Sequence, residues 1–414
     1  MIQLWPQPYN QFTCPRCHAK QVTLNKVIFQ GIHLLADLQC PQCQFGFYQD
    51  YPTGHGITYP SIIDKNHFTL LSPSGLEWLT QPLLDSLRNP IDTALNIYKE
   101  NINPIQPTDT VIFLNCLDAW YGHVLLKLFN LQFYHDLHPS FKKIVLVPKG
   151  FSWMIPDYAD EVWTVDLSLR NTKNYYTQLD SFIKTGLNNY AVVYHAAGYS
   201  HPQLQDIRVE DFFKTRPFNI DQFATLPPRI TIIYREDRLW ISPFFNKAFN
   251  ALNYRNIKFL NKLFLGQQIK RINRFAAALK KILPKTEVFV CGLGKSGTFG
   301  AGIEDKRSVN INEAQELEWC DIYSKSHIII GIHGSNMLIP SSLAASWIEI
   351  LPDDRIGNIT QDLFCRHSYL NMTYFGRFAS EYDPLERIVL NAQKMITDYP
   401  AFKTHQFQSY QIST

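Results

Sequence analysis

The chain has 414 residues, of which 45% are hydrophobic, enough to build two cores and to exclude a disordered polypeptide. Only 18% are charged and the formal net charge is +3, so the chain as a whole is neither strongly acidic nor strongly basic. No run of about 18 uninterrupted apolar residues occurs, and we therefore expect no transmembrane segment.

The amino terminus shows no targeting signal. Residues Met1–Asn10 lack the basic start and the apolar core of a signal peptide. Four of the eight cysteines are scattered in apolar or helical contexts, as reduced core cysteines are. We therefore expect the protein to act in the cytoplasm or at the inner membrane surface.

Two Cys-x-x-Cys pairs stand near the start of the chain. Cys14 and Cys17 are followed, after a segment with two β-type runs, by Cys40 and Cys43. Each pair places two thiolates on one tight turn, so two pairs complete a closed tetrahedral site for structural zinc. The alternative is two unrelated redox pairs. We expect a zinc ribbon over residues 1–45, which docks an acceptor or a partner.

Residues 46–104 are rich in Tyr, Pro and Gly before they turn helical, and we interpret them as a connector that packs on the first large domain. A βα rhythm follows over residues 105–228, which predicts a parallel sheet with helices on both faces. The predicted strands are Thr110–Cys116, Lys143–Pro148, Glu161–Asp166 and Ala191–His195, and the predicted helices are Gly122–Phe133 and Tyr175–Leu187.

A second βα rhythm begins after the proline-rich segment Leu226–Pro228, and it predicts a second Rossmann-like domain over residues 229–414. The fold class is therefore α/β. The predicted strands of this half are Arg229–Tyr234, Glu287–Cys291, His327–Ile332 and Trp347–Leu351, and its clearest helices are Gln267–Leu283 and Asn312–Ser326.

The strand His327–Ile332 stops at a short polar turn. Gly334 lets the backbone approach a ligand closely, and Ser335 and Asn336 suit the start of a helix. The free N–H groups at such a start attract anions. Because ligands of open α/β sheets bind at the carboxyl ends of parallel strands, we expect this turn to cradle a diphosphate.

The stretch Asn312–Pro352 resembles glycosyltransferase family 61, which shows a Glu-Gln-rich helix, a strand, a His-Gly-Ala motif or close variant, and a strand ending Glu-x-x-Pro. Here the third motif residue is Ser335, and the last motif begins at Glu349. Ile230–Arg235 resembles the family's strand that ends in arginine, and Tyr121–His123 resembles its amino-terminal Tyr-x-His helix. The resemblance covers roughly residues 105–400.

The resemblance implies a GT-B fold, in which two Rossmann-like domains face a cleft, here with the added zinc ribbon. It also implies an inverting, metal-independent transfer from a nucleotide sugar to a hydroxyl group of a glycan, a lipid-linked or a protein acceptor. Residues 105–228 would then form the acceptor domain and residues 229–414 the donor domain.

On this resemblance the polar turn holds the donor phosphates, an arginine and a histidine assist, and a strand-end carboxylate binds ribose. The expected donor-binding residues are Arg235, His333, Gly334, Ser335, Asn336 and Glu349. Two alternatives remain: Arg235 forms a surface ion pair with its acidic neighbours, and His333 bonds only to backbone.

An inverting transferase needs a base that takes the proton of the attacking hydroxyl. Asp118 and His123 flank the predicted strand-to-helix turn of the first domain and are the candidate catalytic residues, with His195 and His201 in reserve. The alternative for Asp118 is a helix cap.

Gly292–Gly297 matches the Gly-x-Gly-x-x-Gly fingerprint of dinucleotide sites, but the residues Thr298–Ser308 that follow are loop-like rather than an apolar helix. We therefore expect a flexible loop. Two other function classes stay open. The zinc ribbon and the segment Asn246–Lys285, which has many Lys and Arg and no acid, favour a nucleic-acid-binding protein. A non-catalytic nucleotide- or sugar-binding scaffold is the other.

Overall fold

The computed structural model describes residues 1–72, 76–254, 261–359, 361, 363–364 and 374–411. Its contacts divide the chain into two compact units, Met1–Gln203 and Leu204–Thr414. The sequence analysis had placed this division after Pro228. None of the described helices is both long enough and apolar enough to cross a bilayer. Both units are of mixed α/β type, and each contains a largely parallel sheet.

Unit 1 is built on a six-stranded sheet with the order β1-β10-β7-β8-β9-β6. Its four central strands are parallel and its two edge strands are antiparallel. The central strands are buried, which explains why they read as unbroken apolar runs. The elements are β1 (Ile2–Trp5), β6 (Ile97–Asn101), β7 (Thr110–Asn115), α2 (Tyr121–Leu137), β8 (Lys142–Pro148), β9 (Glu161–Val165), α3 (Thr177–Leu187) and β10 (Val192–His195).

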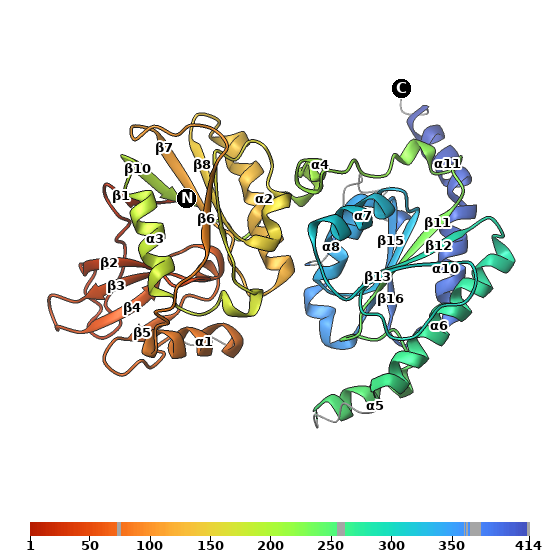
Figure 1. Ribbon diagram of the computed structural model, residues 1–414, viewed down its shortest axis with the longest axis horizontal. Helices are drawn as coiled ribbons and strands as arrows, with labels where there is room; N and C mark the ends of the chain where they lie inside the picture. Colours follow the sequence, from red (N-terminus) through yellow and green to blue (C-terminus); the bar gives the residue numbers. More distant parts are fainter. Residues whose placement is uncertain (73–75, 255–260, 360, 362, 365–373, 412–414) are drawn as a thin grey trace. The chain divides into compact units, whose positions relative to one another are not determined.

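A second, four-stranded antiparallel sheet lies in the same unit (Figure 1). It consists of β2 (Thr23–Phe29), β3 (Leu34–Gln39), β4 (Gly46–Asp50) and β5 (Ile62–Asp64), and α1 (Glu77–Arg88) packs on it. Cys14 and Cys17 precede its first strand, and Cys40 and Cys43 lie between β3 and β4. Both sheets share one core, in which the rings of Phe29 and Phe113 lie 5.8 Å apart. The core therefore joins segments that the sequence analysis divided after residues 45 and 104.

Unit 2 contains a six-stranded, fully parallel sheet with the order β13-β12-β11-β14-β15-β16. Numbered along the chain, this is 3-2-1-4-5-6, the order of the doubly wound dinucleotide-binding fold. The strands are β11 (Arg229–Tyr234), β12 (Glu287–Leu293), β13 (Ile303–Ser308), β14 (Ile328–Ile332), β15 (Ser346–Leu351) and β16 (Gly376–Ser380).

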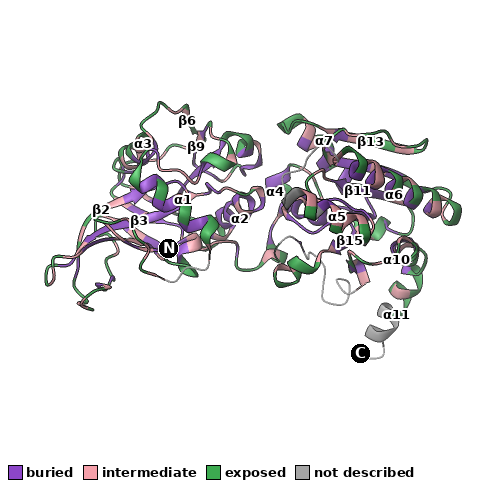
Figure 2. Ribbon diagram, turned by 90° about the horizontal axis from the view of Figure 1, so that it is seen from below, coloured by how far each residue is buried: buried purple, intermediate pink, exposed green. Residues whose placement is uncertain are grey.

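Helices cover both faces of this sheet (Figure 1). α6 and α10 pack together against one face, where Phe275 and Ile388 meet Ile232 in the core. α7 and α8 pack together on the other. The helices of the unit are α4 (Val209–Phe213), α5 (Pro243–Tyr254), α6 (Asn261–Ile282), α7 (Glu313–Ser324), α8 (Leu338–Leu343), α10 (Leu385–Thr397) and α11 (Tyr399–Gln411). Figure 2 shows the strands buried and the outer helix faces exposed.

The segment Thr298–Ser308, expected to be a loop, contains the strand β13. This strand pairs in parallel with β12 at the edge of the sheet. Its sequence, IEDKRS, is mostly charged, and only Arg307 of its six residues is buried. An edge strand needs no apolar run, and charges protect its free side from pairing with other chains. The sequence pattern therefore could not reveal it.

Candidate functional site

In the sheet of unit 2, successive strands are added first on one side of β11 and then on the other. The reversal point of the strand order therefore lies between β11 and β14, which are adjacent and parallel. In doubly wound sheets, ligands bind outside the carboxyl ends of the strands at this reversal. β11 ends directly before Arg235, and β14 ends directly before His333. Two of the expected donor-binding residues, Arg235 and His333, therefore stand where doubly wound sheets in general bind their ligands.

His333 and Glu349 form a buried pair at this point. The distance from Nδ1 of His333 to Oε1 of Glu349 is 3.0 Å, and the two side chains are 1% and 0% exposed. The amide of His333 also donates to the carbonyl of Ile350 at 2.9 Å. The pair ties the end of β14 to β15. A side chain without exposed surface is poorly placed to bind ribose, the role expected of Glu349. Through its bond to His333, Glu349 instead supports the turn.

Gly334 lies in a conformation that favours glycine, with φ 151° and ψ 167°. A Cβ atom at this position would lie 2.4 Å from Nη1 of Arg235. The same Nη1 donates to Oδ1 of Asn336 at 2.6 Å. The turn therefore runs directly against the guanidinium. It continues as the single 3-10 turn η6 (Ser335–Met337), which leads into α8.

Arg235 also forms the ion pair that the sequence analysis had left open. Its Nε and Nη2 donate to the two carboxylate oxygens of Asp237 at 2.8 and 2.5 Å. This pair occupies one side of the guanidinium fork, and Asn336 occupies the remaining Nη1. Arg235 is therefore a fixed part of the turn, and Asp237 balances its charge.

Two further arginines, Arg238 and Arg355, lie close to Arg235, and the sequence analysis named neither as a site residue. Arg238 donates from Nη1 to the carbonyl of His333 at 2.8 Å. Burial lowers the pKa of Arg238, and the positive charges of Arg355 and Arg235 lower it further. Three guanidinium groups thus converge on one end of the sheet. Arg238 and Arg355 each lie four residues after the end of a predicted strand, and nothing else in the sequence indicated a role for them in the site.

A pocket of about 300 Å³ opens beside these arginines, a volume at the lower end of the range for ligand sites. Arg238 and Arg355 supply positive charge to it, and Asp237, Asp354 and Glu381 supply negative charge. Nε of Arg355 pairs with Oδ2 of Asp354 at 3.2 Å. Trp240, Phe249 and Ile332 supply apolar surface. Its full lining is Asp237, Arg238, Leu239, Trp240, Ile241, Asn246, Phe249, Ile332, Ile350, Pro352, Asp354, Arg355 and Glu381.

The glycine-rich loop after β12 is fastened from two sides. The amide of Ser296 donates to Oε1 of Glu236 at 2.9 Å. Arg307 donates to the carbonyls of Ser296 and Gly297, each at 2.9 Å. The loop leads into β13 rather than into a helix, so it lacks the helix start that binds the pyrophosphate in dinucleotide sites.

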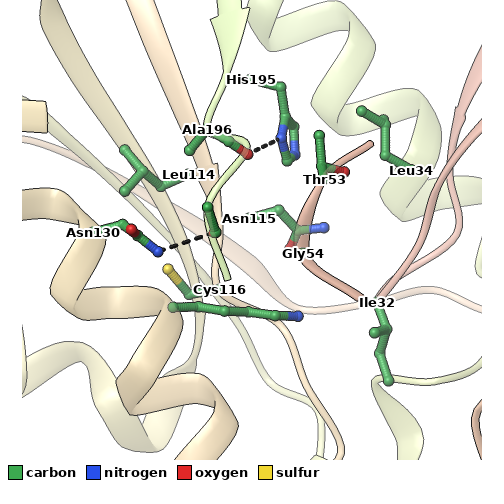
Figure 3. A pocket seen from close by; sticks show the side chains of 12 residues that line it. Ile32, Leu34, Thr53, Gly54, Leu114, Asn115, Cys116, Asn130, His195 and Ala196 are labelled. Atoms are coloured by element: carbon green, nitrogen blue, oxygen red, sulfur yellow. Dashed lines mark hydrogen bonds between the residues drawn. The ribbon is translucent and has the colours of Figure 1, made fainter. Parts of the chain in front are cut away.

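Unit 1 has a reversal point of its own. Its parallel strands have the order β10-β7-β8-β9, so this reversal point lies between β7 and β10. Figure 3 shows side chains from both strand ends, including Asn115 and His195, around a cavity of about 20 Å³. A cavity of this size holds about one water molecule. His195 bonds through Nδ1 to the carbonyl of Ala196 at 2.7 Å, and burial lowers its pKa to about 4.

Asp118 follows the end of β7 and is fully buried. Its Oδ1 lies 3.1 Å from Nδ1 of His123, and its Oδ2 lies 3.0 Å from Nε2 of His55 and 2.9 Å from Nζ of Lys127. Burial alone would raise the pKa of Asp118. The Lys127 ammonium and the hydrogen bonds from the two imidazoles instead hold that pKa well below its usual range.

These contacts decide between the roles expected for the two candidate catalytic residues. A buried carboxylate that is held ionised by three partners does not take a proton from a substrate. The helix-cap alternative fits no better, because the N-cap residue of α2 is Trp120. The side chain of His123 is 26% exposed and binds Asp118 through Nδ1 only. His123 is therefore the residue of this pair that can reach a substrate.

His55 and His201 differ in their distance from the Asp118 carboxylate. The ring of His55 lies 5.4 Å from that of His123, and burial lowers the pKa of His55. His201, held in reserve as a base, is buried and accepts the amide of Gln203 at its Nδ1, at 3.1 Å. Only His55 therefore joins His123 at the Asp118 carboxylate.

Within the described part of the chain, two groups of side chains have the geometry to hold a metal ion. The four sulfur atoms of Cys14, Cys17, Cys40 and Cys43 lie within 4.8 Å of one another. Four thiolates at these distances suit a closed tetrahedral site for zinc or iron. The ligand atoms of His55, Asp118 and His123 also lie within 4.8 Å. There, however, the Lys127 ammonium already balances the carboxylate charge.

Comparison with known proteins identifies no relative from which a function can be read. No family model matches the chain. No curated protein matches it either. Among solved structures, it is similar to the bacterial iron-containing dodecameric glycosyltransferase TibC from enterotoxigenic E. coli H10407. The identity is 10% over 83% of this chain and 80% of that one, with a TM-score of 0.26, too low to inform fold or activity.

Proposed function

We propose that the protein is a glycosyltransferase that moves a sugar from a nucleoside diphosphate sugar to a hydroxyl acceptor. The observation that carries this proposal is the arginine-lined pocket at the reversal point of a 3-2-1-4-5-6 sheet. The resemblance of Asn312–Pro352 to glycosyltransferase family 61 supports it. A GT-B arrangement, inversion and independence of a catalytic metal belong to the same proposal.

The pocket in unit 2 is the proposed donor site. Arg238 and Arg355 bind the diphosphate, because guanidinium groups match phosphate oxygens in geometry and charge. Trp240 and Phe249 supply apolar surface for the nucleoside. Glu381 lines the same pocket and takes the ribose-binding role first expected of Glu349. The turn at Gly334 holds Arg235 and Arg238 in place.

His123 is the proposed base. Asp118 accepts the hydrogen of Nδ1, which leaves the lone pair of Nε2 for the acceptor hydroxyl. Nε2 takes the hydroxyl proton while the oxygen attacks the anomeric carbon and the bond from that carbon to the diphosphate breaks. Asp118 remains a carboxylate and stabilises the imidazolium. The arginines of the donor site stabilise the charge on the departing diphosphate.

A structural metal at the four cysteines, with zinc as the expected ion, completes the proposal. Cys14 and Cys40 are fully buried in the core that the ribbon shares with the main sheet of unit 1. The metal site therefore supports the unit that carries His123. Docking of an acceptor or partner through the ribbon remains a separate hypothesis, which removal of this segment alone cannot test because the core would be lost with it.

The test is turnover of a panel of UDP-, GDP-, ADP- and dTDP-sugars by the full chain, followed as release of nucleoside diphosphate with and without sugar acceptors. We expect one donor to be consumed, and His123→Ala to abolish the acceptor-dependent rate. Nucleotide binding without turnover of any donor would indicate the scaffold alternative. Binding of no nucleotide at all would defeat the proposal.

Two cations in the described part of the basic segment Asn246–Lys285 are bound within the chain. Arg271 lies 5.4 Å from the ring of Trp240 and donates to a backbone carbonyl, and Lys280 donates to the carbonyl of Gly302. These cations are used within the chain. We therefore do not propose nucleic-acid binding.

A further inference from the structure

Two exposed tryptophans flank the proposed base. Trp78 and Trp120 are 38% and 54% exposed, and they are the only tryptophans among the exposed large hydrophobic side chains of the described residues. Their ring centroids lie 6.3 Å apart, and the ring of Trp78 lies 6.0 Å from that of His123. Among the described residues, both exposed indoles therefore lie beside the imidazole that pairs with the buried Asp118 carboxylate.

Four separate segments bring these rings together. Trp78 lies in the first turn of α1, and Trp120 directly precedes α2. Tyr199 follows β10, and its ring lies 4.9 Å from that of His55 and 5.6 Å from that of His123. The backbone amide of Trp120 also donates weakly to the Asp118 carboxylate at 3.4 Å. The aromatic cluster is thus built around the Asp118 carboxylate and not scattered along one helix.

We infer that Trp78 and Trp120 bind the acceptor and that the acceptor presents a pyranose ring. An indole face carries negative charge density, and the C–H groups on one face of a pyranose are its positive complement. A sugar on this face projects its hydroxyl groups from the ring edge, where Nε2 of His123 can accept a proton. The inference rests on the proposed function, because it places the attacking hydroxyl at His123.

The charges at the cluster favour a neutral sugar over a phospholipid acceptor. A phosphate group requires an available cation. Lys127 is 6% exposed, and its ammonium is already bonded to the carbonyl of Leu117 at 2.7 Å and to Asp118. It therefore offers no charge to a ligand. Binding of a peptide or a lipid acceptor instead of a sugar is among the outcomes that the test distinguishes.

Binding can be measured without turnover by saturation-transfer NMR and by titration of the full chain with methyl glycosides of glucose, galactose, mannose and N-acetylglucosamine. Sorbitol, which has the hydroxyl groups but no ring face, is the ligand control. We expect at least one methyl glycoside to bind and sorbitol not to bind. Trp78→Ala and Trp120→Ala should each weaken binding about tenfold, a loss typical of a stacking contact.

Tyr98→Ala is the matched protein control, because Tyr98 is a 50% exposed aromatic residue on β6 of the same unit. This variant should bind the glycosides as the unchanged chain does. Trp120→Phe should retain part of the affinity, because a ring face remains. In turnover, the tryptophan variants should raise the KM for the acceptor about tenfold with little change in kcat or in the KM for the donor.

The outcomes separate this inference from the proposed function. Tryptophan-dependent binding of a glycoside, without turnover of any donor, supports the sugar subsite and contradicts the transferase. Turnover with an unchanged acceptor KM in both tryptophan variants supports the transferase and overturns the subsite. Tryptophan-dependent binding of a peptide or a polyprenyl phosphate, with no glycoside bound, also overturns it. His123→Ala should still bind the glycoside while losing transfer.

Discussion

Nδ1 of His123 lies 3.1 Å from Oδ1 of Asp118, and that carboxylate has no exposed surface. The relationship assigns different roles to two residues that the sequence offered as equal candidates. The buried carboxylate holds its charge and orients the ring, and the partly exposed ring meets the substrate. The assignment can be tested by changing each partner separately.

His123→Ala should reduce transfer roughly 100- to 10,000-fold, the usual contribution of a general base, while the Kd for the nucleotide stays unchanged. His67→Ala is the control, because His67 lies in the same unit with its side chain 75% exposed. Steady-state rates and calorimetric titration with nucleotide provide the two readouts. A variant that retains most of its transfer rate would remove His123 from the mechanism.

Asp118→Asn should lower both activity and stability. The amide no longer selects the tautomer of His123, and the buried Lys127 ammonium loses its counter-charge, at a cost of about 3–5 kcal/mol. Denaturant unfolding of unit 1 measures the second effect, and the pH profile of the rate measures the first. An Asn variant with normal stability would show that Lys127 is not paired with Asp118 in solution.

Stability should depend on pH through two buried histidines, one in each unit. Burial lowers the pKa of both His195 and His327 to about 4. In the unfolded chain a histidine titrates near 6.5. Between about pH 4 and 6.5 the unfolded state therefore binds more protons, and the free energy of unfolding rises with pH by about 1.4 kcal/mol per pH unit for each histidine. Above about pH 6.5 this contribution is constant.

Urea unfolding at several pH values tests this dependence unit by unit. His327 accepts the amide of Arg229 at Nδ1 and bonds to the carbonyl of Phe223 at Nε2, both at 3.1 Å, so the neutral ring is fully used. His327→Gln should flatten the pH slope for unit 2 and leave that for unit 1 unchanged. An unchanged slope for unit 2 in this variant contradicts the assignment.

Metal removal should unfold unit 1 and spare nucleotide binding in unit 2. The ribbon contributes to the shared core, and Asn115 at the end of β7 donates to the carbonyl of Gly31 in the β2–β3 turn at 2.7 Å. Chelation or Cys17→Ser should therefore lower the Tm of unit 1 and abolish transfer. Cys320→Ala, in unit 2, is the control. Elemental analysis should find one metal ion per chain, and full stability without metal would contradict the site.

Gly334→Ala should destabilise unit 2 by about 1–3 kcal/mol, the usual cost of a non-glycine residue in such a backbone conformation. It should also weaken nucleotide binding, because the new Cβ displaces Arg235. Gly266→Ala is the matched control, since a Cβ there meets no atom within 4 Å and α6 gains a better helix former. Equal stability of the two variants would show that the turn tolerates a side chain.

The sequence predicted the central elements of both units because buried parallel strands are unbroken apolar runs. β7, β11 and β14 lie within about one residue of their predicted limits. The edge strands β1, β6, β13 and β16 were missed, because an edge strand is short and needs no long apolar run; β13, for example, is mostly charged.

The candidate site was predictable only in part. Motifs placed Arg235 and His333 directly after strands and His123 at the start of a helix, and the structure has them there. Arg355 lies in the 3-10 segment η7 (Asp353–Asn358) and Trp78 in the first turn of α1, and tertiary packing, which no local periodicity encodes, brings each to its site. The burial of Glu349 was also hidden, because one acid in an apolar strand looks the same whether it meets a ligand or His333.

A crystal structure of the full chain with a bound nucleoside diphosphate tests the central claim most directly. The account predicts the diphosphate at the carboxyl ends of β11 and β14, in contact with Arg238 and Arg355, and a loss of about tenfold in affinity in Arg355→Ala but not in the exposed control Arg387→Ala. A nucleotide bound on the Gly292–Gly297 loop, or affinity that is unchanged in Arg355→Ala, would contradict it.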